Sequence, residues 1–248
     1  MRKAGYGLMF YWTSQSLPEN GSHKPYAEAV RDFNVPEFAD MVENTGAGWV
    51  YLTLGHVKSY CSAPIKAWEK LHPGKTINRD LLMELADELN RCNIKFMFYL
   101  NSPRMANMGK VSSVEYLENH RNLLSEFSNR YGEKCAEYWI DSWYQGYQTY
   151  PDFNFEELMQ LCRIGNSNRV YCINFWLYPL VTAWQDYWAG EVSYPIIPPD
   201  GPIITCGAGR GLPYFALLFL VGRWVYQTKD PESGGIPSPR ISGEEITA

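Results

Sequence analysis

Hydrophobic runs of five to seven residues recur along the first 174 positions of the chain, and longer amphipathic stretches separate them. The runs cover residues 6–12, 49–54, 94–100, 136–141 and 170–174. Each run is almost continuously apolar, as expected of strands that are covered on both faces. The pattern therefore predicts five buried strands of a parallel sheet.

The stretches between these runs carry helix start signals. Asn34 stands three residues before Glu37 with a proline between them, which is typical of a capping box. Ser112 and Asn154 each begin a similar stretch with a glutamate three residues later. A further helix is predicted after Asp80, where apolar residues recur at helical spacing: Leu81, Leu82, Leu85 and Leu89. Strands that alternate with helices in this way are parallel and are joined by right-handed crossovers.

The alternation predicts an α/β fold, and we favour a (β/α)8-like TIM barrel over an open sheet. Hydrophobic runs near residues 202–206 and 223–227 predict further strands, and 248 residues are a typical length for one such barrel. The regular pattern fails after Asn174. We expect long loops over residues 178–202, where prolines interrupt the chain, and a helix over residues 212–220. Residues 1–248 are therefore expected to form a single barrel domain, irregular in its second half.

Composition excludes several classes of function. The net charge is −5 and no cluster of Lys and Arg is present, so neither nucleic acid nor a membrane surface is an expected partner. The six cysteines form no CxxC pair and no histidine cluster accompanies them, so we expect no metal and no cofactor. The cysteine pattern suits a reduced compartment. The chain opens without the apolar segment of a signal peptide, which indicates a cytoplasmic protein. The oligomeric state is left open.

Candidate chemistry follows from the barrel hypothesis, because the carboxyl ends of barrel strands face the active site. Asp141 is prominent there, since a carboxylate ends an otherwise apolar strand. A helix cap or an ion-paired loop residue is the structural alternative for Asp141. Glu191 lies in an aromatic loop that suits one wall of a cleft, although simple surface solvation explains it equally well. The same rule selects several polar and aromatic residues at strand ends: Tyr11, Trp12, His56, Asn101, Trp143, Asn174 and Trp176.

Carboxylates combined with many aromatic residues indicate glycoside chemistry. Aromatic residues make up 15% of the chain, and such rings stack on the apolar faces of sugars as well as filling the core. Retaining hydrolysis needs two carboxyl groups about 5–5.5 Å apart, one as nucleophile and one as acid and base. The acid must keep its proton near neutrality, which an apolar or like-charged setting favours.

Several segments together resemble family 29 of the glycoside hydrolases, the α-L-fucosidases. Five segments are similar to the family in order and spacing. They are the second predicted strand with its leading helix (residues 33–56), the Arg-Asp-Leu segment (79–81), the third strand (94–99), the strand that ends in Asp141, and the Asp-Tyr-x-x-x-Glu loop (186–191). Residues 238–240, Ser-Pro-Arg, are also similar. The resemblance covers roughly residues 5 to 245.

The resemblance implies a retaining exo-glycosidase that hydrolyses a terminal sugar by double displacement without a cofactor. Asp141 would be the nucleophile and Glu191 the acid and base. The substrate would be a carbohydrate, bound by side chains at the strand ends: Tyr11, Trp12, His56, Tyr60, Trp143, Asn174 and Trp176.

The chain also departs from the family pattern. Tyr11-Trp12 stands where the family usually has His-Trp, the stretch from His56 to Tyr60 replaces a His-His-Asp-Gly-Phe motif, and Phe175-Trp176 follows Asn174 where the family has an arginine. The β-sandwich that usually follows the barrel is not expected here. These departures leave an alternative open, a catalytically inactive TIM barrel that binds glycans or serves as a structural module.

Overall fold

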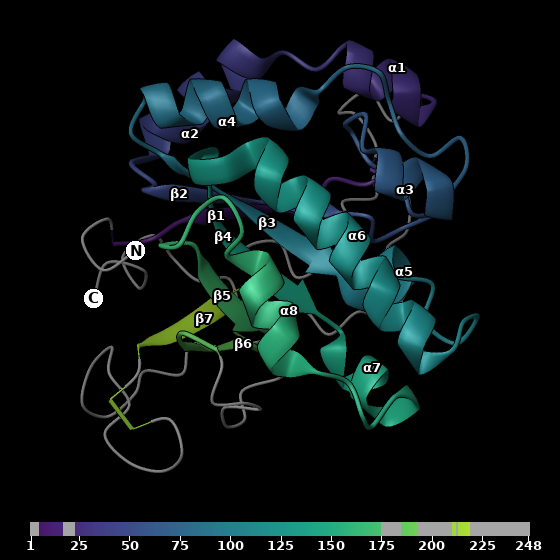
Figure 1. Ribbon diagram of the computed structural model, residues 1–248. Helices are drawn as coiled ribbons and strands as arrows, with labels where there is room; N and C mark the ends of the chain where they lie inside the picture. Colours follow the sequence, from purple (N-terminus) through teal and green to yellow (C-terminus); the bar gives the residue numbers. More distant parts are fainter. Residues whose placement is uncertain (1–4, 17–22, 175–184, 193–209, 212, 219–248) are drawn as a thin grey trace, which may run out of the picture.

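The computed structural model describes residues 5–16, 23–174, 185–192, 210–211 and 213–218. Its centre is a parallel sheet of five strands whose spatial order follows the chain (Figure 1). The strands are β1 (Leu8–Phe10), β2 (Trp49–Leu54), β3 (Lys95–Asn101), β4 (Cys135–Asp141) and β5 (Val170–Ile173). All five predicted strands are confirmed; four agree to within one residue at each end, and the first is shorter than its hydrophobic run. The α/β fold is confirmed, and sequential parallel order is the order of the first five strands of a TIM barrel.

Helices lie between the strands, and four of them, α2, α4, α6 and α8, begin where the sequence signals predict. They are α1 (Tyr26–Arg31), α2 (Val35–Thr45), α3 (Lys66–Leu71), α4 (Leu81–Arg91), α5 (Ser102–Met105), α6 (Ser113–Tyr131), α7 (Trp143–Thr149) and α8 (Phe155–Cys162), with a 3-10 turn at Gly132–Lys134. Asn34, Asp80, Ser112 and Asn154 each accept a hydrogen bond from a backbone N–H of the first turn. These caps satisfy donors that the helix itself leaves unpaired, which explains why the helices start there.

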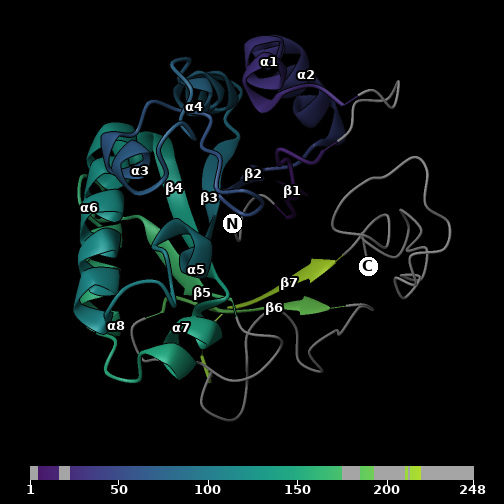
Figure 2. The same ribbon diagram turned by 90° about the vertical axis from the view of Figure 1, so that its right-hand side faces the viewer.

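The sheet has two faces with different contents. On the outer face, Val50, Leu52 and Leu54 of β2 pack against the helices in the larger hydrophobic core. On the inner face, alternate residues of the same strand, Trp49 and Tyr51, pack with rings and thioethers from the other strands. Figures 1 and 2 show the helices gathered on the outer side of the sheet. This alternation is the pattern of a barrel wall, with an aromatic interior and a helical exterior.

Two further strands correct the sequence-based expectation for the second half. β6 (Trp188–Val192) and β7 (Tyr214–Leu218) pair in parallel as a separate two-stranded sheet. Ala189 and Phe215 of these strands, with Tyr187 immediately before β6, complete the inner hydrophobic cluster. The loop predicted over 178–202 therefore contains a strand, and the helix predicted over 212–220 is wrong. A short, wholly apolar run has no periodicity that separates a buried strand from a helix, so pairing with a partner strand decides its conformation. The strands predicted near 202–206 and 223–227 lie outside the described residues.

Two further observations concern the helices and the cysteines. Within the described ranges, no helix is long and apolar enough to cross a membrane. Five cysteines are described and all five are free thiols, four of them buried in the cores: Cys61, Cys135, Cys162 and Cys172.

Candidate active site

Asp141 is the last residue of β4, on the inner face of the sheet, and only 7% of it is exposed. Buried carboxylates need hydrogen-bond donors to replace the water that they lose. Three side chains supply them. Asn174 Nδ2 donates to Oδ1 at 2.9 Å, while Asn101 Nδ2 and Ser142 Oγ donate to Oδ2 at 3.1 and 2.8 Å. All three donors are neutral groups, so they orient the carboxylate without forming an ion pair with it.

The two asparagines come from the strands on either side of β4. Asn101 ends β3 opposite Asp141 in the strand register, and Asn174 follows β5, where its backbone N–H donates to the carbonyl of Ile140. The carboxyl ends of adjacent parallel strands meet at one edge, which is why residues distant in sequence converge here. Asn174 Nδ2 also lies 3.4 Å from the hydroxyl of Tyr99.

The amide of Asn101 is held in one orientation by the helix that follows it. Its Oδ1 accepts the backbone N–H of Arg104 and so caps α5. The next residue, Ser102, is buried and bonded to the hydroxyl of Tyr116 and to Nε2 of His120, at 2.9 and 2.8 Å. Burial lowers the pKa of His120 to about 4, so its imidazole is neutral at physiological pH. This network fixes the junction from which Asn101 reaches Asp141.

The backbone immediately after Asp141 is strained. Ser142 has a φ of 56° and a ψ of 21°, the left-handed region in which a side chain costs about 1 kcal/mol. In this conformation its hydroxyl turns back to the carboxylate of Asp141. Strain of this kind is retained where the surrounding structure requires one geometry, and functional sites are a common place for it.

His56 follows the carboxyl end of β2 and is half-buried. Its Nδ1 shares a hydrogen bond with the hydroxyl of Tyr11, and the two rings meet edge to face at 4.8 Å. Burial lowers the pKa of His56, while the negative charge of Asp141 acts in the opposite direction. The turn before it requires glycine, because Gly55 has a φ of +67° and a Cβ there would lie 2.2 Å from the ring of Trp68.

Trp12 and Tyr60, both predicted to contact the sugar, lie in a different cluster. The rings of both residues pack against Tyr26, at centroid distances of 5.4 and 4.9 Å. Trp12 also meets Phe33 at 5.3 Å, and the ammonium group of Lys75 lies 4.2 Å from the ring of Tyr60. The structure therefore joins Tyr11, His56, Asp141 and Asn174 in one region, and it places Trp12 and Tyr60 against the outer hydrophobic core.

The remaining candidates are placed only in part. Trp143 is the first residue of α7 and thus follows the Asp141 turn directly. Glu191 lies in β6, where its backbone pairs with Leu217. Trp176 falls outside the described residues.

Two other acidic residues approach the inner face, and neither suits the role of partner to Asp141. Glu137 is four residues earlier on β4, so at a strand rise of about 3.3 Å per residue it lies about 13 Å away. Asp186 contacts Arg163 at 2.5 Å and accepts the backbone N–H of Tyr171 near the start of β5.

The chain was then compared with known proteins. The family model described as "Alpha-L-fucosidase" matches residues 6–187, which is well over half of the chain and includes Asp141 and Asn174. The chain belongs to the α-L-fucosidase family. No sequence among the curated proteins matches it.

Solved structures agree with this family on the fold. A glycoside hydrolase family 29 member from an unknown rumen bacterium has 15% identity and a TM-score of 0.53, over 91% of this chain and 45% of that chain. An endo-fucoidan hydrolase of family 107 has 14% identity and a TM-score of 0.51, over 71% and 33%. An α-L-fucosidase from Bacteroides thetaiotaomicron has 18% identity and a TM-score of 0.45, over 68% and 45%. The chain thus spans less than half the length of each of these three structures.

The structure shows what Tyr11, one of the departures from the family pattern, contacts. The tyrosine that replaces a histidine at the end of β1 is bonded to His56 rather than standing apart from it. Sequence reasoning identified Asn101 as a strand-end residue but missed its neighbours Tyr99 and Ser142. Tyr99 could have been found, since it shares a strand face with Asn101; the left-handed turn at Ser142 leaves no signal in the sequence.

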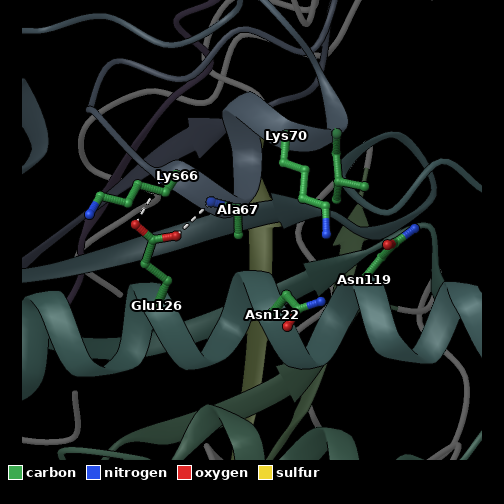
Figure 3. A pocket seen from close by; sticks show the side chains of 7 residues that line it. Lys66, Ala67, Lys70, Asn119, Asn122 and Glu126 are labelled. Atoms are coloured by element: carbon green, nitrogen blue, oxygen red, sulfur yellow. Dashed lines mark hydrogen bonds between the residues drawn. The ribbon is translucent and has the colours of Figure 1, made fainter.

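Two further observations concern metal ligands and a cavity in the described residues. They contain no group of three or more His, Cys, Asp or Glu side chains arranged to hold a metal ion. A cavity of about 330 Å³ lies between α3 and α6, where Glu126 accepts the backbone N–H groups of Lys66 and Ala67 (Figure 3). This cavity belongs to the outer helical layer rather than to the strand ends, and its carboxylate serves as a helix cap.

Proposed function

We propose that the protein is a retaining exo-glycosidase that removes a terminal sugar, with Asp141 as nucleophile and Glu191 as acid and base. The observation that carries the proposal is the carboxylate of Asp141, which is buried at a strand end and oriented by Asn101, Asn174 and Ser142. Three fixed donors hold the carboxylate in one orientation, as a nucleophile that must meet one carbon atom requires.

The reaction has two displacements. A carboxylate oxygen of Asp141 forms a bond to the anomeric carbon while the bond to the leaving oxygen breaks, and that oxygen takes the proton of Glu191. Water then attacks the same carbon, gives its proton to Glu191 and releases the carboxylate of Asp141. Two inversions produce net retention, and every proton is returned.

The place of β6 supports Glu191 in this scheme. Tyr187 and Ala189 belong to the inner cluster, and Glu191 follows Ala189 by two residues on the same strand. The segment with the Asp-Tyr-x-x-x-Glu pattern, residues 186–191, thus begins at the anchored Asp186 and continues along β6.

The substrate proposed first is a terminal α-L-fucoside or a sugar of similar configuration. Relatives by fold are described as an α-L-fucosidase and as an endo-fucoidan hydrolase. The paired rings of Tyr11 and His56 offer a polar edge beside Asp141, and replacement of a family histidine by Tyr11 is expected to shift the preference among sugars.

The test is hydrolysis of an aryl α-L-fucoside beside a panel of other aryl glycosides, by wild type and by Asp141→Asn. Asp152→Asn, an exposed carboxylate in the turn before α8, is the matched control. Activity that Asp141→Asn abolishes and Asp152→Asn retains would support the proposal, and the accepted glycoside would name the sugar. Equal activity in wild type and Asp141→Asn would overturn the assignment of the nucleophile.

A second candidate function is glycan binding without turnover. The observation in its favour is the hydrogen bond between Tyr11 and His56, because two groups expected to contact a sugar contact each other instead. Calorimetric titration of wild type with L-fucose distinguishes the two functions when no glycoside is hydrolysed. Heat of binding without product would favour this second function.

A further inference from the structure

A carboxylic acid lies within the inner face of the sheet, four residues before Asp141 and on the same side of β4. Glu137 is fully buried. Its Oε1 accepts hydrogen bonds from the hydroxyls of Tyr51 on β2 and Tyr187 immediately before β6, and these two hydroxyls lie 3.1 Å apart. Glu137 therefore links the five-stranded sheet to the segment that leads into β6.

Glu137 cannot be the acid of the proposed reaction. Its distance of about 13 Å along β4 from Asp141 exceeds the separation in a retaining pair by a factor of more than two. Its carboxyl group is also occupied, because two tyrosine hydroxyls share one of its oxygens. A role in the reaction would have to act through another residue.

We propose that Glu137 is a positioning residue, which holds the β6 backbone carrying Glu191 in place relative to Asp141 through its hydrogen bond to Tyr187. The inference rests on the proposed function. The spacing supports it, since Glu137 stands four residues before Asp141 on β4 and Tyr187 stands four residues before Glu191. A fixed contact between Glu137 and Tyr187 thus constrains two segments. Each segment carries a proposed catalytic group four residues after the contact.

Neighbouring contacts make this segment a defined anchor rather than a loose loop. Asp186 donates its backbone N–H to the carbonyl of Tyr171 at 3.0 Å, and its carboxylate accepts the N–H of Tyr171 at 2.8 Å. The thiol of Cys172 lies 3.5 Å from the carbonyl of Tyr187. These contacts hold the backbone of the segment to β5, while Glu137 holds the side chain of Tyr187 to the inner face.

A buried carboxyl group here has an energetic cost that an apolar residue would avoid. Burial raises the pKa of Glu137 to about 7, against the opposing effect of the bonds from Tyr187 and Tyr51. Its Oε2 has no hydrogen-bond partner in the part of the chain that the structure describes. Packing alone would favour a leucine at this position, so the two directed bonds are the feature that only a carboxyl or carboxamide supplies.

The experiment compares Tyr187→Phe with Tyr51→Phe. Each substitution removes one hydroxyl bonded to Glu137 and breaks the same bond between the two tyrosines, but only Tyr187 leads into β6. The readout is the ratio of kcat/KM for a 2,4-dinitrophenyl glycoside to kcat/KM for the phenyl glycoside of the sugar that wild type accepts. A displaced acid harms the phenyl substrate more, because its poor leaving group needs protonation.

We expect Tyr187→Phe to raise this ratio by about tenfold, as a partial loss of general acid catalysis would. Tyr51→Phe should leave the ratio within about twofold of wild type. We expect its melting temperature to fall by as much as that of Tyr187→Phe. Glu137→Gln keeps an acceptor oxygen and should retain the wild-type ratio, whereas Glu137→Leu should raise it as Tyr187→Phe does.

The outcomes separate the two ideas. If wild type hydrolyses a glycoside, Asp141→Asn does not, and the two tyrosine variants show equal ratios, then Glu137 is a structural residue only and the inference is overturned. If wild type hydrolyses no glycoside, the proposed function fails and this inference fails with it. Equal ratios for Glu137→Gln and Glu137→Leu would also contradict the positioning role, since only one of them keeps the acceptor.

Discussion

Asn174 donates a hydrogen bond of 2.9 Å to Oδ1 of Asp141 from the end of the neighbouring strand. The bond fixes the rotation of the carboxylate, because Asn101 holds the other oxygen from the opposite side. Two adjacent strands thus orient a residue that ends the strand between them. The proposed catalytic geometry therefore depends on Asn101 and Asn174 as well as on Asp141.

The first prediction concerns this orientation. Asn174→Ala should lower kcat about tenfold or more while KM changes little, because a carboxylate that can rotate attacks less often from the right position. Steady-state kinetics on the aryl glycoside that wild type accepts would measure it. Asn166→Ala is the matched control, since Asn166 lies before β5, at the end far from Asp141, and donates to the carbonyl of Cys135 at the start of β4. Equal losses in both variants would mean that Asn174 only stabilises the fold.

The second prediction separates the two proposed carboxyl roles. Glu191→Ala should lower kcat/KM for the phenyl glycoside by about a hundredfold and for the dinitrophenyl glycoside much less. Added azide should restore turnover and give a glycosyl azide of retained configuration. With Asp141→Ala, azide should instead give the inverted product, because it takes the place of the nucleophile. Product configuration is read by nuclear magnetic resonance. Equal loss on both substrates and no azide adduct would remove Glu191 from the acid role.

The part of the fold that sequence predicts well is the part with strong local signals. The strand Trp49–Leu54 was predicted to the residue, and Asn34 and Ser112 cap their helices as expected. Strand β7 was predicted as a helix, because five consecutive apolar residues fit either structure until a partner strand is known.

The site was predictable at its centre and less so at its edges. Asp141 breaks an apolar strand, which is visible in sequence, and Asn174 ends the next strand. Trp12 and Tyr60 were predicted to bind sugar because they lie near strand ends, yet both pack against Tyr26, which no local pattern reveals. The role of Glu137 depends on a contact fifty residues away with Tyr187, and contacts of that range leave no periodic trace.

The third prediction uses the buried carboxyl group of Glu137. Its pKa is about 7 in the folded chain, against an ordinary value of 4.5, so folding favours its protonated form. The stability that the protonated form contributes is complete below pH 4.5 and is lost as pH rises to 7. At about 1.4 kcal/mol per pKa unit, the loss is about 3 kcal/mol. Urea denaturation of wild type and Glu137→Gln at several pH values measures it, as the difference between their unfolding free energies. A difference that is constant from pH 4 to 8 would contradict the raised pKa.

His120 provides the comparison of opposite sign. Burial lowers its pKa to about 4, from an ordinary value of 6.5. The stability that depends on neutral His120 is complete above pH 6.5 and is lost as pH falls to 4. Between pH 4.5 and 6.5 the two groups therefore offset each other in wild type. The difference between wild type and His120→Asn should rise with pH in this window, while the difference between wild type and Glu137→Gln falls.

The last prediction concerns Arg169, which is only 1% exposed and stands just before β5. Its guanidinium lies 4.7 Å from the ring centre of Tyr138. It donates to backbone carbonyl groups that belong to two different connections: Ser128, Gly132, Cys135, Cys162 and Ile164. These carbonyls lie where α6 leads into β4 and where α8 leads into β5. The planar group of five donors therefore ties together the amino-terminal ends of two strands.

Arg169→Lys should destabilise the fold by about 3 kcal/mol or more. An ammonium group has three donors in place of five, and it cannot reach all of the carbonyls that the guanidinium contacts. Arg130→Lys is the control. Arg130 pairs with Asp80 near the surface, with 34% of its side chain exposed, so its replacement should cost less than about 1 kcal/mol. Urea denaturation with a common m-value compares the two. A loss for Arg169→Lys no larger than that for Arg130→Lys would show that water replaces the missing donors, and that the buried guanidinium is not what holds these strand ends together.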